Sequence, residues 1–347
     1  MKLVPSENLR AGIVGFGLMG KIHAQAYVDS GCAEVVAISN RSDIKMVEYL
    51  DKNPSCRSYS DWRAMLEIEN LDVLSVTTYS PSHYDIVLHG VESGISRIFC
   101  EKPLATRIDD AQAMIDACNQ QAVRLVVNHT RRWSLSHVRL SELLRAGIIG
   151  EVRGIVCSLG GGRLGCNGSH MFDLMRLYTN SEPKWGIGFI DQTGTPNPRG
   201  NEFNDPGGYG QIHFQNGARG YLDLSEDLGI PARFEVIGSM GRATVDEGLN
   251  RWDVITRSAE DQAAPLTAYG LPLEPYQFGT YPTLDILSDA SRAIKELCGE
   301  KEVSCSGEDG KASLEMVMAF HLSHEQANTR IEFPLKGEQL SLELQIT

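Results

Sequence analysis

The stretch that decides the fold is residues 11–20, AGIVGFGLMG. A short apolar run is followed by three glycines, Gly15, Gly17 and Gly20, in the spacing G-x-G-x-x-G. Residues 21–30 read as a helix, so the glycines occupy a strand-to-helix turn. In such a turn the first glycine allows the bend, the second admits a pyrophosphate, and the third allows close helix packing. The stretch predicts a dinucleotide site, which Phe16, Leu18 and Met19 would also line; the alternative is a purely structural glycine turn.

After this turn, short apolar runs alternate with helical segments as far as about residue 130. The runs are EVVAISN (34–40), LDVLSVTTY (71–79), RIFCE (97–101) and RLVVNH (124–129). Runs of this kind at this spacing are typical of buried parallel strands in βαβ units. Residues 1–130 are therefore predicted to form a doubly wound, parallel-sheet domain of the Rossmann type.

The pattern changes beyond residue 131. Apolar and polar residues alternate around Asn-Gly and Gly turns, which predicts antiparallel hairpins. Helices are expected at 169–178, 281–297 and 306–329, and a long loop at 193–208. We expect residues 131–347 to form one α+β domain with a large, open, mostly antiparallel sheet.

Composition limits the possible partners. The chain has 347 residues and a formal charge of 32 − 45 = −13, with no basic block of the kind that binds nucleic acid. It has no apolar run long enough to cross a membrane and no signal-peptide pattern at its start, which favours the cytoplasm. Eight scattered cysteines without a CxxC pair indicate reduced thiols and give no pattern for a metal site.

The end of the second predicted strand bears on cofactor choice. An acidic residue usually binds the ribose 2′-hydroxyl about 20 residues after the glycines. Here the sequence is ISNRS (38–42), and no acid is present. Ser39, Asn40 and Arg41 suit a 2′-phosphate, so NADP(H) is favoured over NAD(H). The alternative is that Arg41 is an ordinary solvated arginine.

The segment CEKPLA (100–105) places Lys102 at the end of the fourth predicted strand. Ligands of doubly wound folds bind at the carboxyl ends of the strands. Pro103 fixes its own φ and restricts the backbone beside the lysine. An ammonium group there would stabilise negative charge on a substrate oxygen. A surface ion pair between Glu101 and Lys102 is the alternative.

At this point a family resemblance is visible. The sequence resembles the glucose–fructose oxidoreductase/inositol dehydrogenase (Gfo/Idh/MocA) family over residues 11–335. The motifs that carry the resemblance are GFGLMG (15–20), TTYSPSH (77–83), CEKPLA (100–105), NHTRRW (128–133), GSHMFDLM (168–175) and FEVIGSMGRATV (234–245). The resemblance implies an NAD(P)-dependent oxidoreductase acting on a sugar, polyol or nucleotide sugar, assembled as a homodimer or homotetramer. It also implies that the Lys102–Pro103 peptide is cis.

The resemblance and the residues together suggest a catalytic set of Lys102, His170 and Asp173. His170 lies in the first turn of a predicted helix, where the macrodipole favours the neutral imidazole that accepts a proton. A helix-capping role for His170 is the alternative. The family's D-x-G-x-H motif reads CNGSH here, so Cys166 stands where relatives have aspartate, and Asp173 is the substitute partner.

Further residues follow from their family positions. Thr78, His83, Glu101 and Lys102 are expected near the cofactor. Arg131, Arg132, Trp133 and Asn167 are expected near the substrate, although the arginines fit interdomain ion pairs equally well. The long loop and its end offer Glu202, Asn204, Asp205 and Tyr209 to substrate hydroxyls.

Two other functions share this fold. One is a non-enzymatic dinucleotide-binding regulator, which has no need of Lys102 or His170. The other is a glycosidase that uses NAD transiently.

Overall fold

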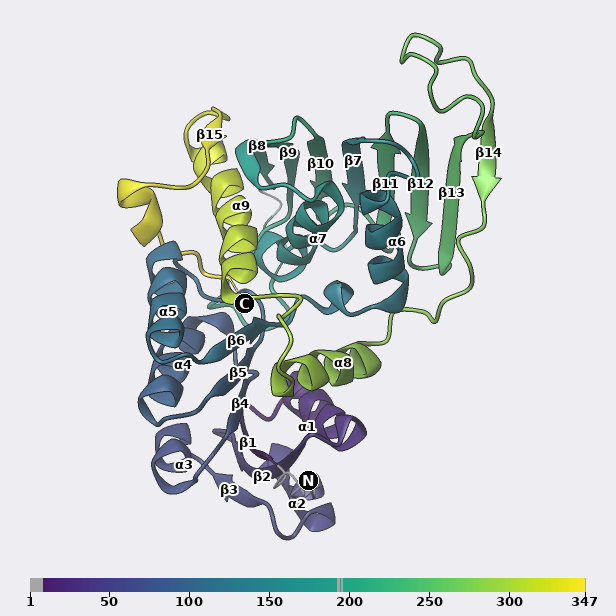
Figure 1. Cartoon of the computed structure of the whole chain (residues 1–347). Coiled ribbons are helices and arrows are strands. Elements are labelled where there is room, and N and C mark those ends of the chain that lie inside the picture. The colour runs from purple at the N-terminus through teal and green to yellow at the C-terminus, as the bar shows by residue number, and fades with distance from the viewer. Residues whose placement is uncertain (1–8, 192–193, 195, 347) are drawn as a thin grey trace. The chain divides into compact units, whose positions relative to one another are not determined.

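A parallel sheet forms the first structural unit of the computed structural model, which describes residues 9–191, 194 and 196–346 (Figure 1). In these residues the sheet has the strand order β3-β2-β1-β4-β5-β6. Its strands are β1 (Leu9–Val14), β2 (Ala33–Ser39), β3 (Arg57–Tyr59), β4 (Val73–Val76), β5 (Arg97–Cys100) and β6 (Arg124–Val127). The doubly wound prediction is confirmed. Strand β3 was missed because it is three residues long and its first two residues are exposed, which removes the apolar signal.

Helices cover both faces of this sheet, which is why its central strands are apolar on both sides. Ile13 and Val73 are both completely buried. The helices that alternate with the strands are α1 (Leu18–Ser30), α2 (Ile44–Lys52), α3 (Trp62–Ile68), α4 (His83–Glu92) and α5 (Ile108–Gln120).

A later segment of the chain returns to this unit. The unit comprises the described residues up to Trp133 together with Ile286–Lys311. The returning segment holds α8 (Ile286–Cys298), which packs on α1, and the start of α9 (Gly307–Glu325). The sequence-based boundaries placed all of 131–347 in the second domain, and the structure corrects them.

Edge protection gives a physical reason for this return. Strand β6 ends the sheet, and an open strand edge invites unwanted pairing. The Val127 N–H donates to Cys305 O at 3.2 Å, and Val126 forms an isolated bridge with Ser306. The returning segment therefore covers part of the exposed edge.

The second unit comprises the described residues of Ser134–Asp285 and those from Ala312 onward. Its described residues form a sheet in the order β14-β13-β12-β11-β7-β10-β9-β8-β15. All neighbours are antiparallel except β7 and β10, which run parallel. The strands are β7 (Val152–Ser158), β8 (Pro183–Ile190), β9 (Gly208–Phe214), β10 (Arg219–Leu224), β11 (Arg233–Gly238), β12 (Gly241–Asp246), β13 (Arg251–Arg257), β14 (Leu273–Tyr276) and β15 (Ile331–Glu332). The predicted mostly antiparallel α+β unit is confirmed.

The two faces of this second sheet differ. Helices α6 (Leu135–Arg145) and α7 (Ser169–Thr179) lie over one face, and Leu222 and Phe234 are buried (Figure 1). Strand pairing places Tyr221 opposite Val156, so both side chains project from the same face, and both are about two-fifths exposed. This face therefore carries partly exposed apolar side chains among polar ones such as Gln211 and Glu235.

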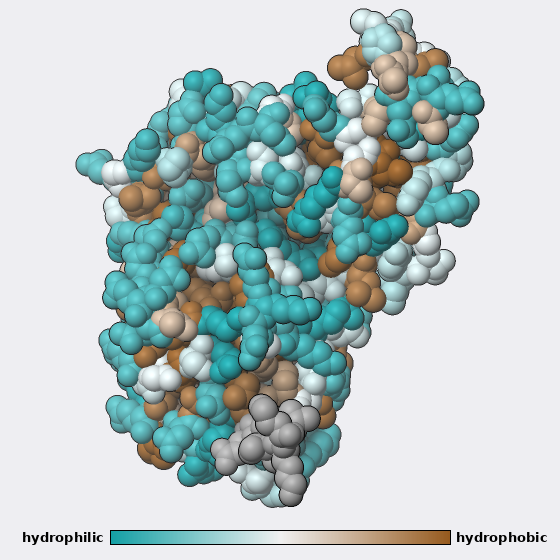
Figure 2. Space-filling view, viewed as in Figure 1, coloured by the Kyte–Doolittle hydropathy of each residue, from teal (hydrophilic) through white to brown (hydrophobic). Residues whose placement is uncertain are grey.

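The exposed surface is mainly hydrophilic on the side shown in Figure 2, as the share of charged residues in the sequence predicts. Smaller hydrophobic patches lie between the hydrophilic residues on that side (Figure 2). Among the described residues, no helix combines the length and apolarity that a membrane span requires.

Candidate active site

The glycine turn has the geometry that an anion site needs. Gly15 has φ +91°, and its N–H donates to Ser39 O at 2.8 Å. A Cβ on Gly20 would lie 2.2 Å from Gly15 O, whereas a Cβ on Gly17 would meet no atom within 4 Å. Gly17 is the N-cap of α1 and makes no side-chain cap, so the first N–H groups of the helix remain available to a phosphate. Leu18, which follows, is 77 % exposed.

The loop after β2 supports this turn. Asn40 Oδ1 accepts from the Phe16 N–H at 3.0 Å, and Asn40 Nδ2 donates to Ser42 O at 2.9 Å. Ser39 is buried at 2 % exposure. Asn40 thus uses its side chain to brace the glycine turn, and Ser39 is largely covered. Arg41 is exposed, and its guanidinium makes no hydrogen bond or ion pair with the described residues.

His83, predicted to be near the cofactor, is a buried link between two loops. Its Nε2 lies 3.0 Å from Thr78 O, and its Nδ1 lies 3.0 Å from Pro103 O. Burial lowers the pKa of His83, although the backbone carbonyls and Glu101 oppose that shift. The geometry assigns His83 to holding the segment after Lys102 against the end of β4.

Glu101 lies at the centre of a buried polar network. Its Oε1 lies 3.1 Å from His23 Nε2 and accepts from Asn128 Nδ2 at 2.7 Å. His23 Nδ1 in turn lies 3.2 Å from Ser75 Oγ, and the ring stacks on Phe99. The network joins α1, β4 and the segments that follow β5 and β6. Its geometry accounts for Glu101 as a structural group.

The electrostatics of Glu101 follow from this network. Burial alone would raise the pKa of the Glu101 carboxyl. The hydrogen bond and charge of His23, the charge of Lys102 and the Asn128 amide outweigh burial, so the pKa lies below its usual value. The carboxylate is therefore ionised at neutral pH, and its negative charge lies beside Lys102.

Lys102 follows Glu101 at the carboxyl edge of the parallel sheet and is half-buried. The Lys102–Pro103 peptide is cis, as the family resemblance implied. The lysine is therefore attached to a backbone segment that the Glu101 network holds on one side and His83 on the other.

Arg132 and Trp133 contact the returning segment. The Arg132 guanidinium lies 3.0 Å from Asp309 Oδ1 and donates to Ser304 O at 2.7 Å. Trp133 is buried, and its Nε1 donates to Glu296 Oε2 at 3.3 Å. These contacts pack both residues within the first unit, and their substrate role stays a prediction. Arg131 is half-buried and stays a predicted substrate residue.

In the second unit, a tight turn leads into α7. Residues Leu164–Gly168 form a single π-helical turn, a feature that often marks functional sites. Asp205 is buried, and its carboxylate accepts from the Gly165 N–H at 2.6 Å and the Cys166 N–H at 2.9 Å. Asp205 therefore supports the turn, and its contact with a substrate hydroxyl stays a prediction.

Helix α7 carries His170 in its first turn and Asp173 one turn later. Met171, Leu174, Met175 and Tyr178 are buried, as their spacing predicted. Asp173 is 1 % exposed and His170 is half-buried. Asn167 uses its amide to donate to Gly162 O at 3.0 Å, which makes it part of the turn.

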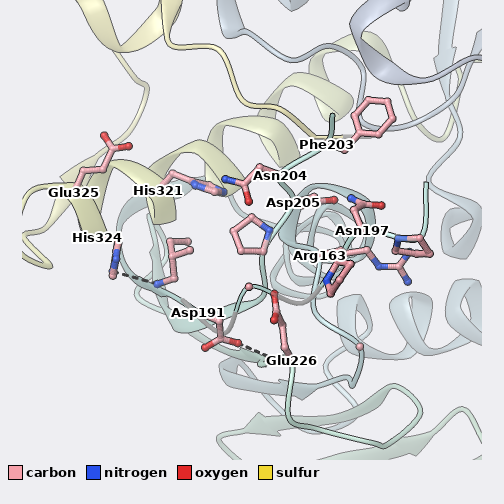
Figure 3. Close-up of a pocket in the computed structure, with 16 residues that line it drawn as sticks. Arg163, Asp191, Asn197, Phe203, Asn204, Asp205, Glu226, His321, His324 and Glu325 are labelled. Carbon is pink, nitrogen blue, oxygen red and sulfur yellow. Dashed lines mark hydrogen bonds between the residues drawn. The ribbon is translucent and has the colours of Figure 1, made fainter. Parts of the chain in front are cut away.

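The second unit contains a cavity of about 480 Å³ beside this turn (Figure 3). Arg163 and Asp205 line it next to the start of α7, and Asn204 lines it from the long loop. Predicted residue Glu202 is exposed outside its lining, and Tyr209 lies on β9 against Phe189. Of the long loop, residues 193 and 195 fall outside the described part of the chain.

Two histidines of α9 complete the cavity wall. His321 and Asn204 point toward one another in Figure 3. The buried Nε2 of His321 has no hydrogen-bond partner among the described residues, and burial together with His324 lowers the pKa of His321 to about 4. A neutral imidazole donates through one nitrogen and accepts through the other. The sequence analysis missed these residues; the only signal was two histidines three apart in FHLSHE (320–325).

Arg163 was also missed. Its backbone has φ +68°, a conformation that costs an arginine energy and is often retained for function. Its guanidinium makes no hydrogen bond or ion pair with the described residues. Among those residues no three His, Cys, Asp or Glu side chains are grouped as a metal site.

The Glu101 network gives a testable expectation. Because the folded pKa of Glu101 is lowered, its stabilising effect is complete above the unfolded pKa of about 4.3 and is lost as pH falls through the folded pKa. Glu101→Gln should therefore reduce the free energy of unfolding at pH 7 by about 1–3 kcal/mol. The deficit should shrink as the pH falls below about 4.

Urea denaturation at a series of pH values measures this deficit. Glu92→Gln, the same change at an exposed position of α4, is the control and should leave the urea midpoint unchanged. An equal deficit at pH 7 and at acidic pH would show that the charge of Glu101 does not contribute.

Comparison with known proteins agrees with this geometry. Residues 9–129 match the family model described as an oxidoreductase family with an NAD-binding Rossmann fold. A myo-inositol 2-dehydrogenase of Thermotoga maritima is 25 % identical over 329 residues, covering 88 % of this chain and 93 % of that protein. A D-apiose dehydrogenase of Paraburkholderia graminis is 31 % identical over 144 residues. That match covers 42 % of this chain and only 38 % of the relative's own length.

Solved structures show the same fold over nearly the whole chain. An oxidoreductase from Agrobacterium radiobacter, in complex with NAD⁺, L-tartaric acid and magnesium, aligns with a TM-score of 0.78 at 19 % identity. The alignment covers 94 % of this chain and 98 % of that one. A levoglucosan dehydrogenase in complex with NADH and levoglucosan aligns with a TM-score of 0.76 at 21 % identity, covering 95 % and 100 %. Residues 9–129 therefore match an oxidoreductase family with an NAD-binding Rossmann fold, and the chain as a whole has the fold of these solved oxidoreductases.

Proposed function

We propose that this protein is an NAD(P)-dependent dehydrogenase that transfers a hydride between a nicotinamide and the hydroxyl- or keto-bearing carbon of a sugar, polyol or nucleotide sugar. The observation that carries this proposal is Lys102, a half-buried lysine held at the carboxyl edge of a dinucleotide-type sheet. The buried Glu101 network and His83 position its backbone. A cation fixed at this edge suits a developing alkoxide.

The residues of the first unit fit a dinucleotide. The open space at Gly17, the uncapped start of α1 and the exposed Leu18 leave room for a pyrophosphate and its ribose. When bound, a nicotinamide dinucleotide supplies the hydride acceptor or donor. The first turn of α1 would hold its phosphates, and Arg41 lies at the end of the loop that faces the ribose in this fold.

The catalytic groups have separate tasks. In the oxidation direction, Lys102 stabilises negative charge on the substrate oxygen as the hydroxyl loses its proton. His170 accepts that proton, which requires a neutral imidazole. Asp173, buried one helical turn after His170, is proposed to orient it, in place of the aspartate that Cys166 replaces.

The cavity of the second unit supports a polyhydroxylated substrate. Its wall combines amides (Asn197, Asn204), carboxylates (Asp191, Glu226), a neutral imidazole (His321) and an arginine (Arg163). Such a mixture offers both donors and acceptors, and sugar hydroxyls use both. Uncharged substrates that carry several hydroxyl groups are therefore the class to screen first.

Substitution of the two catalytic residues tests the mechanism. Lys102→Ala and His170→Ala should each lower kcat by roughly 10²-fold or more, the usual scale for general acid–base and electrostatic groups. Dinucleotide affinity should change little. Activity is measured from reduced-nicotinamide absorbance across a panel of sugars, polyols and nucleotide sugars, with Lys301→Ala, an exposed lysine of the first unit, as control.

The outcomes separate the candidate functions. Turnover of no substrate by the unmodified protein, together with dinucleotide binding, would favour a regulator. Release of a glycoside's leaving group with no net change in nicotinamide absorbance would favour an NAD-dependent glycosidase. Full activity in both variants would contradict the proposed roles of Lys102 and His170.

Cofactor choice is a second proposal, supported by Arg41. This exposed guanidinium stands where an acid would select a ribose 2′-hydroxyl, and it has no competing ion pair among the described residues. A 2′-phosphate would supply the missing counter-charge. NADP(H) is therefore the proposed cofactor.

Binding of both cofactors tests this choice. NADP(H) should bind at least several-fold more tightly than NAD(H), and Arg41→Ala should narrow the difference because only the phosphate contact is lost. Calorimetry or fluorescence quenching measures each Kd, with Arg63→Ala on α3 as an exposed control. Equal or tighter binding of NAD(H) by the unmodified protein would rule the proposal out.

Assembly is a third proposal, supported by the open face of the second sheet. Val156, Tyr209, Tyr221 and Ile237 project from this face and are each about two-fifths exposed or more. Their cross-strand neighbours on the same face include Gln211, Asp223 and Glu235, and such a mixture of apolar and polar side chains is typical of subunit interfaces. A second copy of the chain is proposed to cover it in a closed, symmetric dimer or dimer of dimers.

Light scattering coupled to size-exclusion chromatography tests this assembly. The unmodified protein should elute as a dimer or tetramer at micromolar concentration. Tyr221→Glu should shift it toward the monomer because the new charge would be buried in the interface. Tyr269→Glu, at a 92 % exposed position outside this face, should leave the assembly unchanged. A monomeric unmodified protein would refute the proposal.

A further inference from the structure

Two cysteines of the first unit differ from the rest. All eight cysteines are free thiols, and six of them are buried. Cys32 and Cys298 are the two that are partly exposed. Cys32 lies between α1 and β2, whereas Cys298 is the last residue of α8. The folding of the returning segment onto α1 brings these distant positions together.

The contacts place the two thiols side by side. Cys32 Sγ lies 3.1 Å from Ser30 Oγ and 3.8 Å from Ile294 O. Ile294 is one helical turn before Cys298, so its carbonyl is the acceptor for the Cys298 N–H. Cys298 lies one turn after Ile294 on the same face of α8, and it is the group with the largest effect on the pKa of Cys32. The two thiols are therefore neighbours where α8 packs on α1.

The surroundings give the two thiols different reactivity. The hydrogen bond from Cys298 is the main cause that lowers the pKa of Cys32 to about 6; burial opposes it, while Ser30 and Lys295 assist. The same hydrogen bond, together with burial, raises the pKa of Cys298. A thiolate is the attacking form in thiol–disulfide exchange. Cys32 thus has the character of an attacking thiol and Cys298 that of a resolving thiol.

We propose that Cys32 and Cys298 form a reversible intramolecular disulfide, with a small-molecule disulfide such as oxidised glutathione as the oxidant. The Cys32 thiolate attacks one sulfur of the oxidant, forming a mixed disulfide and releasing one thiolate. Cys298 then loses its proton to solvent and attacks Cys32 Sγ, releasing the second thiolate and closing the Cys32–Cys298 bond. Two protein thiols are oxidised and the small disulfide is reduced to two thiols.

The bond has a structural consequence. Ile286–Lys311 joins the first unit after the chain has built most of the second unit. Its attachment rests on non-covalent contacts such as the Arg132–Asp309 ion pair and the Trp133–Glu296 hydrogen bond. A disulfide from Cys298 to Cys32 fastens α8 covalently to the end of α1. Closing so long a loop restricts the unfolded chain and stabilises the unit.

Peptide mapping of the full chain tests the proposal. The protein is equilibrated in buffers of reduced and oxidised glutathione, alkylated at acidic pH and digested without reductant. The expected product is a single cross-linked pair of peptides that contain Cys32 and Cys298, fully reversed by dithiothreitol. Cys298→Ser should trap glutathione on Cys32, whereas Cys32→Ser should leave Cys298 unmodified. Cys56→Ser, a buried cysteine of the same unit, should behave as the unmodified protein does.

Two further measurements complete the test. At pH 6, iodoacetamide should alkylate Cys32 on the order of tenfold faster than it alkylates free glutathione, because the larger thiolate fraction outweighs the weaker nucleophilicity of a low-pKa thiol. Oxidation should raise the Tm by about 5 °C or more, and Cys298→Ser should abolish that rise.

Several results would overturn the inference. These are a chain that stays fully reduced in oxidised glutathione, a persistent mixed disulfide on Cys32 in the unmodified protein, and Cys298 reacting in Cys32→Ser. An unchanged Tm after the bond has formed would overturn the fastening role. None of these results depends on the proposed dehydrogenase activity.

Discussion

The constraint on which the position of Lys102 depends is a buried negative charge. Glu101 is 6 % exposed, and an ionised carboxylate at such depth is tolerated only when it is paired and hydrogen-bonded. His23 and Asn128 supply those partners from α1 and from the end of β6. The network therefore forms only when α1, β5 and the end of β6 are all correctly placed relative to one another. Because Lys102 directly follows Glu101, the same placement fixes the backbone of Lys102.

The same logic explains His83. It reaches Thr78 O and Pro103 O from the start of α4, and burial keeps its pKa low. Lys102 is thus framed by two buried polar residues that need not contact a ligand themselves. The backbone of Lys102 is thereby fixed, so only the rotamers of its own side chain remain variable.

The second unit uses a different device to present its side chains. Asp205 satisfies two N–H groups of the π-helical turn that leads into α7, so the start of that helix is fixed by a carboxylate from the long loop. The cavity beside this turn draws its lining from strand ends, the loop and α9. Because these lining residues come from separate segments of the chain, a substitution in one segment changes the cavity wall without changing the others.

The sequence by itself determined the Rossmann unit, the mostly antiparallel second sheet, the glycine turn and the buried stripe of α7. These features depend on local periodicity and on the conformational freedom of glycine at Gly15. Both can be read from residues that are close together in the sequence. Only the tertiary structure decided the roles of Glu101, Asn40, Arg132 and Trp133, and the participation of His321 and Arg163. Each of these roles is set by a partner more than 20 residues away or by a cavity wall, as the Arg132–Asp309 pair illustrates. The return of Ile286–Lys311 to the first unit was likewise invisible in the sequence, because an amphipathic helix shows that it has a face to bury but not which surface it will bury it against.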